Sequence, residues 1–117
     1  MTGFGELVGL EVGDPVEEGK VMVTLDADER HLNRHGTVHG GAIATLVDVA
    51  MGAAVASAGS DAPVTIEMKV TYLEPGQAGR LVAEACVRKH GRRVTIVEAE
   101  VTQNDDLVAH AIATFAS

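Results

Sequence analysis

The residues best suited to chemistry lie between Asn33 and Asp48, in the stretch NRHGTVHGGAIATLVD. A polar loop leads into the glycine pair Gly40 and Gly41, and small or apolar residues then run to a single acid at Asp48. Burying an unpaired carboxylate costs several kcal/mol or shifts its pKa upward. An acid on a helix of Ala, Val, Leu and Met therefore indicates a functional site, and the polar loop with its glycines indicates the entrance.

The glycine pair and the acid are expected to lie on one helix. Apolar side chains recur at helical spacing after the glycines and form a continuous stripe. Small residues surround the acid on a second face, which lets another backbone or a slender ligand approach, and Gly59 and Pro63 end the helix. The free N–H groups and partial positive charge of its amino terminus suit an oxygen that carries or develops negative charge. The stripe consists of Ile43, Leu46, Val47, Ala50, Met51, Ala54, Val55 and Ala58, and the second face of Gly41, Ala44, Thr45, Asp48 and Gly52.

The rest of the chain has the composition of strands joined by turns. A hairpin is expected between residues 10–16 and 21–26, after a short helical segment that starts at Phe4, and residues 28–32 suit one helical turn. Later strands are predicted at residues 64–73, 80–89, 94–103 and 108–115, separated by the turns EPGQAG, HGRR and NDD. Short turns make neighbouring strands antiparallel. We therefore predict a single α+β domain over residues 1–117, with an antiparallel sheet of about five to six strands wrapped around one central helix.

Composition argues against several classes of function. The formal net charge is −8 at pH 7 and the aromatic residues are Phe4, Tyr72 and Phe115, whereas nucleic acids require basic faces and aromatic platforms. The single cysteine, Cys86, excludes an intramolecular disulfide and is expected to be a buried, inert thiol. The apolar run of the central helix is interrupted and shorter than the roughly 20 residues that cross a bilayer. We therefore expect a protein that binds neither nucleic acid nor membrane. Because the first residues lack a basic, apolar leader, we expect it to be cytoplasmic.

A small set of residues carries a resemblance to a known family. The pattern N-x-x-G-x-x-H-G-G, followed by a helix with an acid at its eighth position, resembles the hotdog-fold acyl-CoA thioesterases of the phenylacetate-degradation, or PaaI-like, family. The resemblance extends over nearly the whole chain, through the VTIEMKVTYLEPGQAG strand and turn and the HGRRVTIVEAEV hairpin. It implies a hotdog fold and hydrolysis of an acyl-CoA to a carboxylic acid and CoA, with no metal and no organic cofactor. The discriminating residues are Asn33, Gly36, His39, Gly40, Gly41 and Asp48.

The family pattern also implies roles for individual residues. The backbone N–H of Gly40 would polarise the thioester carbonyl, and His39 and Asn33 would shape and orient that site. Asp48 would act on the carbonyl carbon as general base or as nucleophile. Thr65 stands where the family often has a hydroxyl that helps to hold the attacking water. Which of its two roles Asp48 takes stays open at this point.

Helix geometry assigns the two ends of the motif to different sites. Asp48 follows Gly40 by eight residues, which is about 12 Å along a helix that rises about 1.5 Å per residue. One carbonyl cannot contact both. Two antiparallel copies of the helix across a two-fold axis would bring Gly40 of one subunit close to Asp48 of the other. The sequence thus predicts a homodimer with two composite sites, either alone or within a dimer of dimers.

Two features near the motif have alternative interpretations. Asp48 could be a surface residue paired with Arg30 or Arg34, but exposed helix faces normally carry several charges, whereas its neighbours are small or apolar. Evenly spaced histidines in the loop could bind a metal, yet the asparagine and glycines among them oppose the continuous helix that would point them one way. We therefore expect no metal site. The histidines are His31, His35 and His39.

A basic cluster in the predicted hairpin is a further candidate for substrate binding, together with Gly41 at the helix start. It holds four of the nine Lys and Arg residues within six positions of an otherwise acidic chain. The cluster could be a solvated turn, or it could attract the phosphates of CoA, for which Arg and Lys are natural partners. Its members are Arg88, Lys89, Arg92 and Arg93.

Three functions remain compatible with these patterns. Hydrolysis of an acyl-CoA is favoured by the acid in its small-residue face and by the glycine turn. A hotdog hydratase or dehydratase acting on acyl thioesters usually brings a His and acid pair in a different motif. A protein that binds acyl-CoA without turnover would use the same pocket, although Asp48 and its loop argue against it. Aryl, hydroxyaryl and medium-chain acyl groups are all compatible with the sequence.

Overall fold

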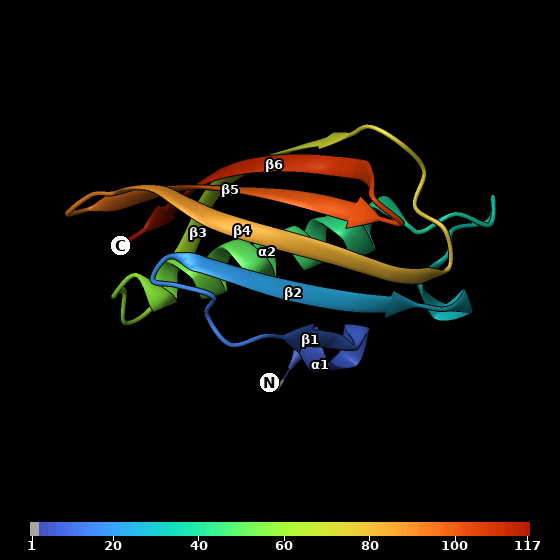
Figure 1. Ribbon diagram of the computed structural model, residues 1–117, viewed down its shortest axis with the longest axis horizontal. Helices are drawn as coiled ribbons and strands as arrows, with labels where there is room; N and C mark the ends of the chain where they lie inside the picture. The colour runs from blue at the N-terminus through green and yellow to red at the C-terminus, as the bar shows by residue number, and fades with distance from the viewer. Residues whose placement is uncertain (1–2) are drawn as a thin grey trace.

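The computed structural model describes residues 3–117 as an antiparallel sheet that curves over one long helix (Figure 1). The elements are α1 (Phe4–Val8), β1 (Leu10–Val12), β2 (Lys20–Ala27), a 3-10 turn (Glu29–His31), α2 (Gly40–Ser57), β3 (Val64–Tyr72), β4 (Gly79–His90), β5 (Val94–Gln103) and β6 (Asp106–Ala116). The six strands lie in the order β1-β2-β4-β5-β6-β3. Thus β1 and β3 are the two edges of the sheet, and α1 lies beside the β1 edge.

The apolar stripe of α2 packs against the concave face of the sheet and forms the centre of the core. All its predicted members are buried except Ala58, which is half-buried because it caps the helix end. β4 and β6 present alanines to the helix, so the two layers can approach closely. At Gly52 an added Cβ would lie 3.4 Å from the ring of Phe115. By length and composition α2 could cross a membrane, but here it is the core helix beneath a sheet.

The predicted α+β architecture is confirmed, with differences in the sheet and at one side chain. β1 ends at Val12, before the expected residue 16, because Pro15 has no N–H to continue the ladder. The expected turn EPGQAG does not form a hairpin, since β3 pairs with β6 and β4 pairs with β2 and β5. The connection instead crosses the end of the sheet, where Gln103 bonds the backbone N–H and C=O of Gln77 at 2.8 and 2.7 Å. Cys86, expected to be buried, is half-buried.

Candidate active site

The amino terminus of α2 is capped by His39 and has one free donor. The His39 Nδ1 accepts a hydrogen bond from the Gly41 N–H at 2.8 Å, so the neutral imidazole carries its proton on Nε2. The Tyr72 hydroxyl, at the end of β3, donates to the Gly40 C=O at 2.7 Å. Within residues 3–117 the Gly40 N–H donates to no protein acceptor. That N–H is therefore available to a bound carbonyl at the positive end of the helix dipole.

Asp48 lies half-buried on α2 and is bound to β3. Its Oδ1 accepts the hydroxyl proton of Thr65 at 2.6 Å. Within the described part of the chain Asp48 forms no ion pair, and Arg30 pairs with Asp28 at 2.9 Å instead. The structure therefore does not support the interpretation of Asp48 as a surface acid paired with Arg30 or Arg34. The second carboxylate oxygen of Asp48 has no protein hydrogen-bond partner among residues 3–117, so it is free to accept a proton.

Asn33 organises the loop that leads to α2. Its Oδ1 accepts from the N–H groups of His35 at 2.8 Å and Thr37 at 3.2 Å, and its Nδ2 donates to the Thr37 hydroxyl at 3.0 Å. Between them Gly36 adopts a φ of +83°, a left-handed conformation that favours glycine. These contacts occupy the Asn33 side chain inside its own loop. Asn33 therefore holds the path of the loop that leads to α2.

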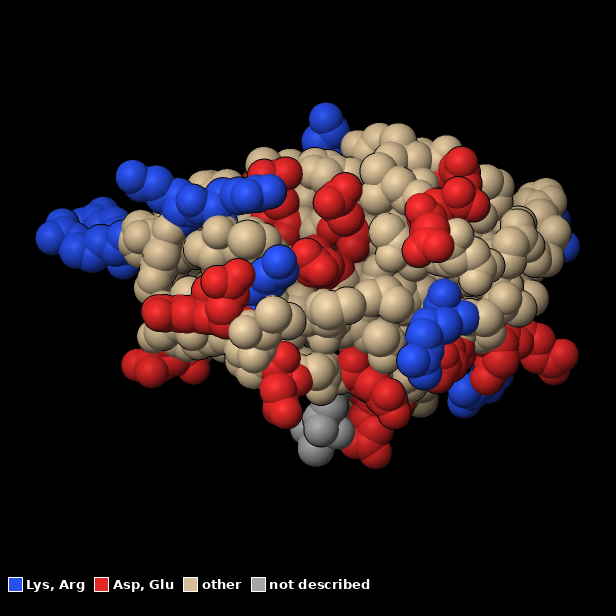
Figure 2. Space-filling model, in the orientation of Figure 1, with Lys and Arg blue, Asp and Glu red and all other residues tan. Residues whose placement is uncertain are grey.

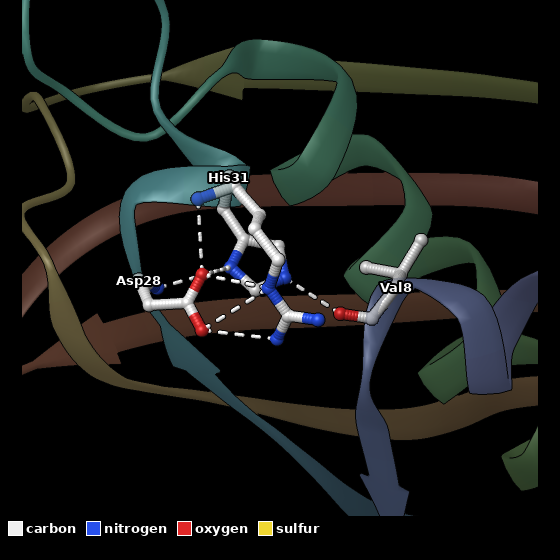
Figure 3. Close-up of polar contacts among 4 residues, drawn as sticks. Val8, Asp28 and His31 are labelled. Atoms are coloured by element: carbon white, nitrogen blue, oxygen red, sulfur yellow. Dashed lines mark hydrogen bonds and ion pairs between the residues drawn. The ribbon is translucent and has the colours of Figure 1, made fainter.

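His31 is buried and links α1 to the same loop through hydrogen bonds (Figure 3). Its Nε2–H donates to the Val8 C=O at 2.6 Å and its Nδ1 accepts from the Asp28 N–H at 3.0 Å. Its C=O accepts from the His39 N–H at 2.8 Å. Hydrogen bonds from Arg30 hold Asp28 in place and lower the pKa of that carboxyl to about 2. Both His31 ring nitrogens are thus occupied, and within residues 3–117 no group of three or more His, Cys, Asp or Glu side chains could hold a metal ion.

Two hollows flank the first turn of α2. One, of about 320 Å³, opens between α1, the 3-10 turn and the outer face of α2, with His39 and Gly41 in its wall. The other, of about 390 Å³, opens beside the end of β3, with Gly40 and Tyr72 in its wall. Both have the size of small-molecule sites. The helix start lies between the two hollows, so a ligand bound at the Gly40 N–H could extend into either of them.

The basic cluster lies at the tip of the β4–β5 hairpin, at the opposite end of α2 from Gly40. Figure 2 shows Lys and Arg side chains gathered at the end where this hairpin projects in Figure 1. Arg88 is partly used, because it pairs with Glu98 at 2.8 Å. Hydrogen bonds from His110 and Arg88 lower the pKa of Glu98. The cluster members that are exposed and form no ion pair within the described chain are Lys89, Arg92 and Arg93.

The candidate residues form three separate groups in the chain. The first lies at the helix start and includes Tyr72, which the sequence analysis did not identify as a site residue. Its only mark in the sequence is that it is the single tyrosine and stands just before LEPG. The second pairs Asp48 with Thr65 further along α2, and the third is the hairpin tip. Gly40 and Asp48 both lie on α2, as the sequence predicts.

The chain is similar in sequence to known proteins. A family model described as Thioesterase superfamily matches residues 35–110. Human acyl-coenzyme A thioesterase 13 is 36% identical over 86 residues, which are 72% of this chain and 61% of the human protein. This chain thus spans less than two thirds of the length of that relative.

Solved structures are similar over nearly the whole of both chains. The structure of a mutant of phenylacetic acid degradation protein PaaI from Thermus thermophilus has a TM-score of 0.89 and 32% identity, and the match covers 97% of this chain and 96% of that one. The structure of smu.793 from Streptococcus mutans UA159 bound to acetyl CoA has a TM-score of 0.89 and 30% identity, covering 99% of this chain and 91% of that one. The sheet and its central helix are therefore a shared architecture.

Proposed function

This chain belongs to the thioesterase superfamily as a PaaI-like protein of hotdog fold, and we propose that it hydrolyses an acyl-CoA to a carboxylic acid and free CoA. The observation that carries the proposal is the free N–H of Gly40 at the start of α2. Acyl transfer depends on a fixed donor aimed at the carbonyl oxygen, where negative charge develops. The name of the human relative and the acetyl CoA bound to the Streptococcus mutans protein support this substrate class.

The active site is proposed to be shared between two subunits. Gly40 and Asp48 lie about 12 Å apart along α2, and each is bound to a different end of β3, through Tyr72 and Thr65 respectively. β3 is an edge strand on which Val64 and Ile66 are exposed, while Met68 and Val70 are half-buried against the core. Long apolar edge strands are templates for pairing with another chain. A second copy of β3 is therefore the partner that best fits this edge.

Antiparallel pairing of the two β3 strands joins the halves of the site. We place Thr65 opposite Tyr72 of the partner subunit, where facing residues have Cα atoms about 4.5–5.5 Å apart. Asp48 then lies at the interface because it is hydrogen-bonded to Thr65. Gly40 of the partner subunit lies there too, because the corresponding tyrosine is bonded to it. Each Asp48 thus meets the helix start of the other subunit, and the two-fold axis produces two identical sites.

In such a site the side chains divide the steps of hydrolysis. The thioester oxygen accepts the Gly40 N–H, which stabilises the negative charge of the tetrahedral intermediate. The attacking water donates one hydrogen bond to the free oxygen of Asp48 and another to the Thr65 hydroxyl oxygen. The Thr65 hydroxyl itself donates to Asp48 Oδ1. Asp48 removes the proton as the water oxygen bonds the carbonyl carbon. The C–S bond then breaks, and Asp48 returns its proton to the departing CoA thiolate.

The β4–β5 hairpin of the partner subunit is proposed to hold the phosphates of CoA. In this dimer the α2 helices of the two subunits run antiparallel, and each continues about 14 Å beyond Asp48. The β4–β5 hairpin of the partner subunit therefore lies beyond the helix start at which the carbonyl binds. CoA has its phosphates at the far end of the pantetheine arm, and Arg and Lys bind phosphate as hydrogen-bonded ion pairs. The exposed, unpaired cations of this hairpin are suited to that contact.

Replacing Arg92 and Arg93 together with Ala is expected to raise KM for an acyl-CoA about tenfold with little change in kcat, because phosphate contacts stabilise ground and transition states alike. Steady-state kinetics at low and high salt measures the change. Arg80→Ala is the matched control, since it removes a surface guanidinium paired with Asp26 at the other end of β4. An unchanged KM in the double variant would contradict a role of the hairpin in binding CoA.

Release of free thiol from a panel of acyl-CoAs tests the proposed function directly. The panel includes acetyl-, hexanoyl- and phenylacetyl-CoA, with the free acid quantified beside the thiol. A thioesterase releases both in equal amounts. Binding of the whole panel without thiol release would instead identify a non-catalytic acyl-CoA-binding protein. Hydration of an enoyl-CoA without thiol release would identify a hydratase.

A further inference from the structure

The hollow between α1 and the start of α2, here named the α1 pocket, has a mostly apolar wall. Its apolar side chains come from α1, from the end of the 3-10 turn and from the first turn of α2. It borders His39 and Gly41, next to the free N–H that receives the carbonyl. The pocket therefore begins where the acyl group of a bound thioester begins. The apolar residues are Phe4, Leu7, Val8, Leu32 and Ala42.

Apart from His39, the polar side chains of the α1 pocket already have partners inside the protein. Arg30 at the rim pairs with the Asp28 carboxylate at 2.9 Å. Both ring nitrogens of His31 are hydrogen-bonded. The Thr45 hydroxyl donates to the Gly41 C=O at 2.8 Å. A charged or hydroxylated group in the pocket would therefore lack a ready partner except at the helix start, where the Nε2–H of His39 is not hydrogen-bonded within residues 3–117. Burying such a group unpaired is costly.

α1 is a distinct wall of this pocket. Leu7 and Phe4 are 74% and 64% exposed, so they add little to the core. Gly3 and Gly9 adjoin the two ends of α1 with left-handed φ values of +73° and +91°, and His31 ties the helix end to the loop. Neighbouring exposed apolar side chains beside a pocket are typical of a surface that contacts a ligand or another protein.

We propose that the α1 pocket receives the acyl group and selects for uncharged, apolar acyl groups, with Leu7 as a specificity-determining residue. The inference rests on the proposed thioesterase function. The Arg30 charge is neutralised by Asp28, so it does not attract an acyl group that ends in a carboxylate. The pantetheine arm leaves on the other side of the helix start, through the hollow beside β3.

Two substrates with six-carbon acyl chains test the selection for apolar groups. We expect kcat/KM to be at least about tenfold higher for hexanoyl-CoA than for adipoyl-CoA, which differs by a terminal carboxylate. Equal values, with hexanoyl-CoA hydrolysed, overturn the inference and leave the proposed function standing. A lack of thiol release from the whole acyl-CoA panel overturns the proposed function and this inference with it.

Paired substitutions at Leu7 test the wall itself. Leu7→Ala is expected to raise the ratio of kcat/KM for decanoyl-CoA to that for hexanoyl-CoA about tenfold, and Leu7→Trp to lower it by a similar factor. Neither change removes a core side chain, because Leu7 is exposed. Val16→Ala, at a residue that is 61% exposed and outside the pocket, should leave the ratio as in wild type. An unchanged ratio in both Leu7 variants overturns the role of α1.

Discussion

Replacing Asp48 with Asn is expected to lower kcat by about 10²- to 10⁴-fold while the fold stays intact. Asn keeps an oxygen that can accept the Thr65 hydroxyl, which Asp48 binds at 2.6 Å, so the contact between α2 and β3 is preserved. The amide cannot take a proton from water, and the loss falls on the chemical step. KM should change little, so kcat and kcat/KM should fall together. Thiol release at saturating acyl-CoA measures the effect.

The matched control is Asp14→Asn, which makes the same substitution at an exposed acid outside the pockets described here. It should have wild-type activity. Thr65→Val removes the hydroxyl that orients the water and should lower kcat less than Asp48→Asn does. Wild-type turnover in Asp48→Asn would contradict the general-base role of this residue, whatever the other variants show.

The helix that carries the site is the part of the fold most directly predicted by sequence. Apolar spacing placed the buried stripe of α2, and the glycine pair and Gly59 placed its ends, which the structure has at Gly40 and Ser57. Such local patterns depend on the 3.6-residue period and on backbone preferences near the helix termini. For the same reason the strands were found in nearly the right places, since alternation and turn residues are also local.

Contacts between distant elements could not be predicted in the same way. Tyr72 meets Gly40 across 32 residues and His31 meets Val8 across 23, and neither pair has a local pattern. The pairing of β3 with β6 depends on packing over the whole sheet, while the short turn after β3 suggested β4 as its neighbour. Helix rise alone predicted that Gly40 and Asp48 belong to different sites. The edge strand suited to joining two subunits became visible only in the structure.

Gly40→Pro is expected to lower kcat by about 10²- to 10³-fold, because it removes the N–H that polarises the carbonyl. Gly40 is the first helical residue, where proline is well tolerated. His39 before it has a φ of −58° and a ψ of 135°, an extended conformation that proline allows in its predecessor. Gly40→Ala is the matched control, since it adds a Cβ 3.3 Å from the Tyr72 hydroxyl but keeps the N–H. Equal turnover in the two variants would exclude the N–H from catalysis.

A heterodimer of the Gly40→Pro and Asp48→Asn chains then tests whether each site is shared. Co-expression with two different tags, followed by purification on both, isolates the mixed dimer. In a composite arrangement one of its sites combines the intact Gly40 of one chain with the intact Asp48 of the other, and the second site carries both substitutions. We therefore expect about half of the wild-type activity per dimer from two chains that are each almost inactive alone. If each site were built within a single chain, both sites of the heterodimer would be damaged, and no activity would return.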